Sequence, residues 1–146
     1  MSAARRIALA TLVAGALDIG FAAINTAAAG KPIAGMLRSV ASGPFADAPH
    51  WGTAGAAAGL AVHFAIMAVM AAVFVIAVDR IGWVRKNWLL AGLLYGLVLW
   101  LVMYGVVLPQ RFGAAFPTSK PIELAKQLFA HIGLVGLPIA LIARGK

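Results

Sequence analysis

The sequence predicts an all-α integral membrane protein, a four-helix bundle with a short interfacial amphipathic helix between the first and second spans. Of its 146 residues, 63% are hydrophobic and only 11% are charged. A soluble domain is about 45–50% apolar and about 25% charged, so this chain has too few polar residues to cover a water-facing surface. Its apolar runs do not alternate with polar residues, so in lipid they are expected to form helices, which satisfy their own backbone hydrogen bonds. We expect one transmembrane domain over residues 1–146.

The four predicted spans cover residues 7–29, 54–78, 88–108 and 122–143. About 20 residues cross the hydrocarbon core as a helix, and each run reaches that length. The alternative for the first run is a cleaved signal peptide, because Arg5 and Arg6 precede it and alanines occupy 27–29. The run exceeds the usual signal-peptide core of about 7–15 residues and contains Asp18, so we expect a retained span.

Residues 31–49 are too polar for a span and instead predict a short helix lying in the outer interface. Ile33, Met36, Leu37 and Val40 recur at helical spacing, and Gly43-Pro44 should end the helix. The alternative interpretation is an ordinary linker between the first two spans.

Small residues at intervals of three or four should allow close contact between helices, which in lipid replaces the hydrophobic drive for association. The pattern predicts a compact bundle or a homo-oligomer and identifies no partner. The residues are Gly55 and Gly59 in the second span, Gly92 and Gly96 in the third, and Gly133, Gly136 and Ala140 in the fourth.

The fourth span has its own local signals. Pro121 suits the first turn of a helix, where its missing N–H costs nothing, and Glu123 suits the positive end of the helix dipole. Pro138 lies in the interior and cannot bond the carbonyl of Leu134, so we expect a kink there.

The distribution of lysine and arginine favours both termini in the cytoplasm. The tight loop with Arg80, Arg85 and Lys86, flanked by Trp83 and Trp88, is the clearest sign of a cytoplasmic side. Of the 12 basic residues, one side would hold Arg5, Arg6, Arg80, Arg85, Lys86, Arg144 and Lys146, and the other Lys31, Arg38, Arg111, Lys120 and Lys126.

Polar residues inside the spans are the candidate site, because such groups usually face the bundle interior and need partners. Thr11, Asp18 and Asn25 are spaced by seven and share one face of the first helix. Glu123, Gln127 and His131 follow at steps of four in the fourth helix. His63 and His131 should lie at the same depth, roughly 13 Å from the outer side at 1.5 Å per residue, near the level of Asp18. The predicted intramembrane polar cluster is Asp18, Asn25, His63, Glu123, Gln127 and His131.

Three interpretations of this cluster remain open from the sequence. In the first, the cluster is a structural network that fixes helix register. In the second, it is a protonatable site for an ion, a proton or a small solute. In the third, His63 and His131, on separate helices, are a pair of haem b ligands. A cuprous site with Met67, Met70 and Met103 is a weaker alternative, since methionine in an apolar helix usually packs. We expect the protein to contain no bound metal and no bound cofactor.

Other classes of function are excluded or not indicated. The chain has no cysteine, which excludes disulfides, iron–sulfur clusters and thiolate zinc sites. Its net charge is +8, and the basic residues cluster at the ends of apolar runs. Anionic lipid headgroups explain this placement, so no nucleic-acid partner is expected. There is no GxSxG, Walker or HExxH motif, and an enzyme is not indicated. The leading expectation is a structural or accessory membrane protein, either a homo-oligomer or a subunit of a larger membrane complex.

Short motifs lie along most of the chain: Leu17-Asp18-Ile19, the segment 37–43 (LRSVASG), His63, the segment 92–96 (GLLYG), Val107-Leu108-Pro109, and Glu123 with His131. Together they resemble small uncharacterised bacterial inner-membrane proteins of the YagU-like four-helix group. The resemblance spans nearly the whole chain and implies a bacterial inner membrane and a four-helix fold. It brings no assigned activity.

Overall fold

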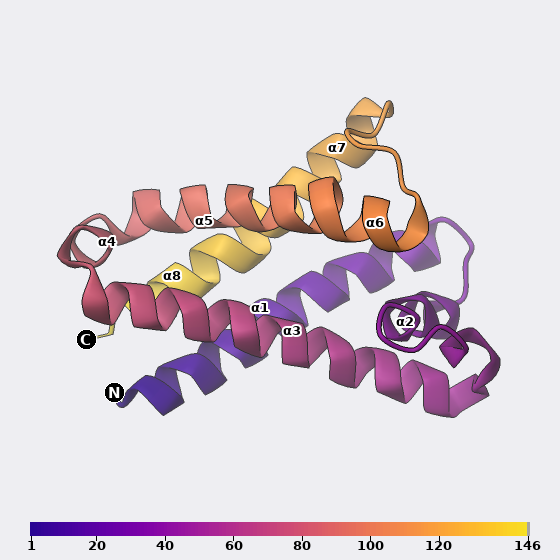
Figure 1. Cartoon of the computed structure of the whole chain (residues 1–146), viewed down its shortest axis with the longest axis horizontal. Coiled ribbons are helices and arrows are strands. Elements are labelled where there is room, and N and C mark those ends of the chain that lie inside the picture. Colours follow the sequence, from indigo (N-terminus) through magenta and orange to yellow (C-terminus); the bar gives the residue numbers. More distant parts are fainter. Residues whose placement is uncertain (146) are drawn as a thin grey trace.

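The computed structural model describes residues 1–145, and all of its regular structure in that range is helical. Four long helical segments run along the molecule: α1 (Ala3–Ala28), α3 (Gly52–Arg80), α5 with η2 and α6 (Trp88–Phe112), and α7 with η3 and α8 (Pro121–Ala143) (Figure 1). Each is long and apolar enough to cross a membrane. The predicted all-α four-helix bundle is therefore confirmed, and the chain is a membrane protein.

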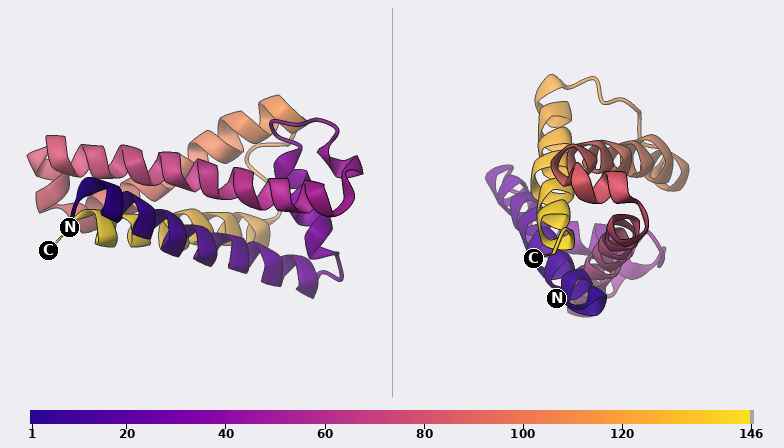
Figure 2. Two further views of the ribbon diagram at one scale, coloured as in Figure 1. Left: turned by 90° about the horizontal axis from the view of Figure 1, so that it is seen from below. Right: turned by 90° about the vertical axis from the view of Figure 1, so that its left-hand side faces the viewer.

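The two chain ends lie at the same end of the bundle, as Figures 1 and 2 show. The short helix α4 (Gly82–Lys86), which joins α3 to α5, is at this end too. We call it the terminal end, and we call the opposite end, which carries α2 (Ile33–Ala41) and η1 (Ala48–His50), the α2 end. Lys146, one of the basic residues used to predict orientation, lies outside the described residues.

The short helix α2 lies crosswise to the long helices and is seen end-on in Figure 1. It spans Ile33–Ala41, as the apolar spacing predicted, so the alternative of an ordinary linker is wrong. Its backbone packs directly on α3, where a side chain at Gly59 would overlap the carbonyl of Leu37. This contact fixes α2 across the end of the bundle.

The buried core lies mainly in the terminal half, where α1, α3, α5, η3 and α8 meet. Its fully buried members are small or branched, among them Ala10, Ala14, Val75, Val135 and Ile139. Large apolar side chains such as Leu12, Val69 and Ile76 point outward on the same helices. This inverted distribution suits a bundle whose solvent is lipid.

Helices α5 and η3 (Phe129–Gly136) are in backbone contact. A Cβ added at Gly96 would lie 2.5 Å from the His131 carbonyl oxygen, and one at Gly136 would lie 2.5 Å from that of Gly92. Only glycine permits this approach, so the glycine pattern of the third span serves a contact within the chain.

Two π-helical segments, η2 (Met103–Val107) and η3, each end two residues before a proline. Pro109 and Pro138 have no N–H, and their rings crowd the carbonyl four residues earlier. A wider turn relieves that crowding and lets the freed carbonyls find other donors. The sequence predicted a kink at Pro138, and the structure has a widened turn before this proline and another before Pro109.

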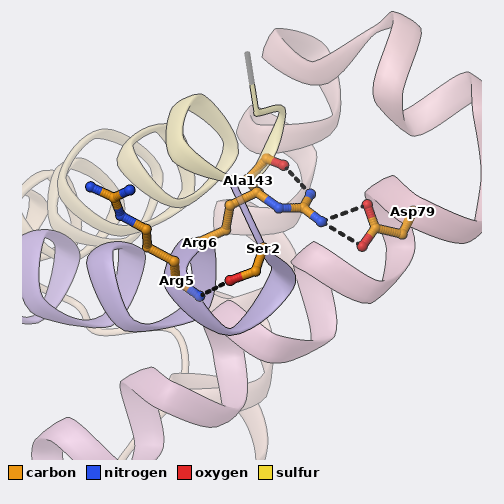
Figure 3. A network of polar contacts seen from close by, with 5 residues as sticks. All are labelled: Ser2, Arg5, Arg6, Asp79 and Ala143. Atoms are coloured by element: carbon orange, nitrogen blue, oxygen red, sulfur yellow. Dashed lines mark hydrogen bonds and ion pairs between the residues drawn. The ribbon is translucent and has the colours of Figure 1, made fainter.

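At the terminal end, the side chain of Arg6 joins three helices (Figure 3). Its Nη2 donates to both carboxylate oxygens of Asp79 in α3, at 2.9 and 2.6 Å, and its Nη1 donates to the carbonyl of Ala143 in α8 at 2.7 Å. Arg6 is only 8% exposed. From the sequence, Arg6 was counted only as one of the basic residues that indicate the cytoplasmic side. In the structure it also caps the C-terminal carbonyl end of α8.

Replacing Gly59 with alanine should destabilise the bundle, because the new methyl group would displace α2 from α3. We expect Gly59→Ala to lower the unfolding free energy by about 1–3 kcal/mol in detergent. Gly20 is the matched control, since a Cβ there meets nothing within 4 Å. Gly20→Ala should be neutral or stabilising by up to about 1 kcal/mol, and equal losses in the two variants would contradict the packing argument.

Removing the Arg6 side chain should also destabilise the fold, because Asp79 and the Ala143 carbonyl both lose a charged donor. Arg6→Ala should cost about 1–3 kcal/mol in the same unfolding assay. Arg5, one residue earlier, has no side-chain hydrogen bond or ion pair within residues 1–145 and is the control. Arg5→Ala is expected to stay within about 0.5 kcal/mol of the parent.

Candidate functional site

A polar cavity of about 210 Å³ opens at the α2 end, between α1 and the fourth segment. These two segments diverge toward that end (Figure 1). Near the mouth lie Glu123 and Lys126, which form an exposed ion pair at 3.3 Å. Asp18 and His131 lie deepest, since each is ten residues, or roughly 15 Å, from the end of its helical segment. The full lining is Asp18, Phe21, Ala22, Asn25, Tyr104, Glu123, Lys126, Gln127, Ala130 and His131.

Five of the six residues predicted as an intramembrane polar cluster therefore line one cavity: Asp18, Asn25, Glu123, Gln127 and His131. The sixth, His63, reaches Asp18 from α3, with its Nδ1 3.9 Å from Oδ2 of the carboxylate. Thr11, which shares the face of Asp18 in the sequence pattern, is not among the lining residues.

The hydrogen bond of His63 decides which of its nitrogens carries a proton. Its Nε2 lies 2.9 Å from the carbonyl oxygen of Gly15, and because a carbonyl only accepts, Nε2 must donate. In the neutral ring, Nδ1 is then a bare acceptor that faces the carboxylate of Asp18. Nδ1 and the carboxylate are then two acceptors that face each other, 3.9 Å apart.

Most polar side chains of the cavity bond to their own helices. Asn25 donates to the carbonyl of Phe21 at 2.8 Å, and His131 donates through Nδ1 to the carbonyl of Gln127 at 3.2 Å. Gln127 accepts from Trp100 Nε1 at 3.3 Å. The carboxylate of Asp18 accepts no hydrogen bond from any residue within 1–145. The cavity therefore keeps unused hydrogen-bonding capacity at the carboxylate of Asp18.

Both π-helical segments contribute to this cavity. Tyr104 comes from η2 and His131 from η3, and their rings meet edge to face with centroids 5.4 Å apart. π-Helical turns are rare and frequently mark functional sites. Sequence spacing gave no sign of the place of Tyr104 beside His131. The signal that could have revealed it is Pro109, which sets the widened turn at Met103–Val107.

The haem hypothesis does not fit this geometry. The Nε2 of His63 is engaged by Gly15, and the cavity at His131 is smaller than the roughly 300–1,000 Å³ of pockets for drug-sized ligands. The alternative of a cuprous site does not fit either, because Met67 and Met70 pack in the apolar core. Across residues 1–145, no three His, Asp or Glu side chains gather as a metal site.

Comparisons of the chain with protein-family models, with curated proteins and with solved structures found no match. The interpretation of the cavity therefore depends on its own residues and contacts.

Cysteine substitution should show that the cavity is open to water, and the chain is suited to it because it has no native cysteine. Ala22→Cys, in the cavity lining, should react with a membrane-impermeant thiol reagent at least roughly tenfold faster than Leu17→Cys, since the thiolate forms only where water reaches it. Leu17 is the control because it is exposed on α1 and is not among the lining residues. Equal rates in reconstituted vesicles would contradict a water-accessible cavity.

Proposed function

We propose that this chain is a small proton-responsive membrane protein that takes up and releases a proton at the Asp18–His63 pair through the polar cavity. The main support for this proposal is the arrangement of Asp18 and His63. A fixed donor at His63 Nε2 turns Nδ1 toward Asp18, and Asp18 lines a cavity whose mouth holds the exposed Glu123–Lys126 pair. Intramembrane ionisable groups are costly and most often serve function.

Proton exchange would take place from the α2 end. The other half of the bundle is filled by the apolar core and closed by the Arg6–Asp79 ion pair. The arrangement therefore supports a proton-binding switch or an occluded state of a transporter better than an open channel. Acidification at the α2 end would add a proton to the pair and remove negative charge from the cavity floor.

The membrane and orientation are part of the proposal. The basic α4 loop, with Arg85 and Lys86, favours the terminal end in the cytoplasm. The guanidinium of Arg144 adds to this, because it lies 4.3 Å from the centroid of the Trp88 ring at the same end. The α2 end and its cavity would then face away from the cytoplasm. The motifs of the YagU-like group favour a bacterial inner membrane.

A structural or accessory role in a larger membrane complex is the second candidate. Purification in mild detergent tests this role, because a stoichiometric membrane partner would support it. A homogeneous assembly of this chain alone would count against it.

Removing the carboxylate of Asp18 should abolish proton uptake within the bilayer. In lipid nanodiscs, infrared difference spectra between acidic and alkaline buffer should show a protonated-carboxyl band that Asp18→Asn removes. The same substitution should change the histidine nitrogen signals of His63, because its Nδ1 loses the group it faces.

Asp47→Asn is the matched control, because Asp47 is exposed in the loop before η1 and its carboxylate bonds only Trp51 within residues 1–145. It should leave the band and the His63 signals unchanged. Carboxyl difference bands of the same size in Asp18→Asn and in the parent, or a spectrum without any pH-dependent carboxyl band, would refute the proposal.

A further inference from the structure

A second and larger cavity, an apolar groove of about 730 Å³, opens at the α2 end. Its walls are Val62 and Ile66 of α3 and Met103 and Val107 of η2, and Met36 of α2 borders it. Its volume lies within the range of ligand pockets, about 300–1,000 Å³. The groove shares no lining residue with the polar cavity.

One charged side chain, Arg111, stands among the residues that line the groove. Its Nε donates to the carbonyl of Gly43 at 2.8 Å and its Nη2 to that of Ser42 at 2.9 Å. These bonds orient the guanidinium beside the loop that follows α2. Its Nη1 makes no hydrogen bond to any residue within 1–145, and no Asp or Glu lines the groove. A guanidinium with a fixed orientation, an unused N–H donor and no carboxylate in the groove lining is suited to bind an anionic group.

The dimensions of the groove match one leaflet of a bilayer. Arg111 and Met103 are eight residues apart on one continuous helical segment, or about 12 Å along its axis. Half of the hydrocarbon core is about 15 Å. Arg111 lies near the outer end of this segment, where a headgroup would be, and Met103 lies toward mid-membrane.

We propose that this groove binds one anionic phospholipid, with an acyl chain against Val62, Ile66, Met103 and Val107 and the headgroup phosphate on Arg111. The apolar walls exclude a free phosphate as the main ligand, since they would contribute nothing to its binding. Charge complementarity at Arg111 favours an anionic lipid over a zwitterionic one.

The test measures lipid retention by the purified full chain with native mass spectrometry, after titration with phosphatidylglycerol or phosphatidylcholine. The parent should retain one phosphatidylglycerol in preference to phosphatidylcholine. Arg111→Gln should weaken phosphatidylglycerol binding about tenfold, which is the usual size of one charge-assisted hydrogen bond. Lys120→Gln, an exposed basic residue at the same end that does not line the groove, should leave binding unchanged.

A second variant fills the groove and leaves Arg111 in place. Val62→Phe should also lower phosphatidylglycerol retention, whereas Val69→Phe should not, because Val69 is 64% exposed on α3 outside the groove. Circular dichroism and gel filtration would confirm that the variants fold.

Three results would overturn the proposal. They are equal retention of the two lipids by the parent, unchanged retention in both folded groove variants, and displacement of the lipid by glycerol phosphate alone.

Discussion

The backbone contact between α5 and η3 at Gly92, Gly96 and Gly136 is the constraint on which the cavities depend. In lipid, helices gain little from burying apolar surface, so the glycine contact must hold the fourth segment in place through close packing. Together with the Arg6 clamp, it ties the long segments from the terminal end to mid-membrane. Beyond that point α1 and α7 diverge, and both cavities lie in this half of the bundle.

Composition and run length were sufficient to predict the four helices and α2, because lipid leaves helices as the simplest way to satisfy the backbone. The polar lining was predictable for the same kind of reason. Asp18, Asn25 and His131 are too costly to face acyl chains, so they had to turn inward, and periodicity showed which of them share a face. Five of the six predicted residues line one cavity because depth and helical phase follow directly from residue number.

Other features depend on distances between helices, which sequence spacing does not contain. Arg6 looked like a topology signal because basic residues near a span end usually are, and only the position of Asp79 reveals the ion pair. The place of Tyr104 beside His131 was not predictable, because its direction follows from a widened turn across which regular α-helical phase does not apply. The orientation of His63 depends on the Gly15 carbonyl, a backbone group that no side-chain pattern marks.

The π-helical segment η2 is the wall that the two cavities share. Met103 lines the apolar groove and Tyr104, the next residue, lines the polar cavity beside His131. π-Helical turns are rare and frequently mark functional sites. If an occupant of the groove changed proton binding at Asp18, proton binding would change the affinity of the groove by the same factor, because coupling between two binding sites is reciprocal.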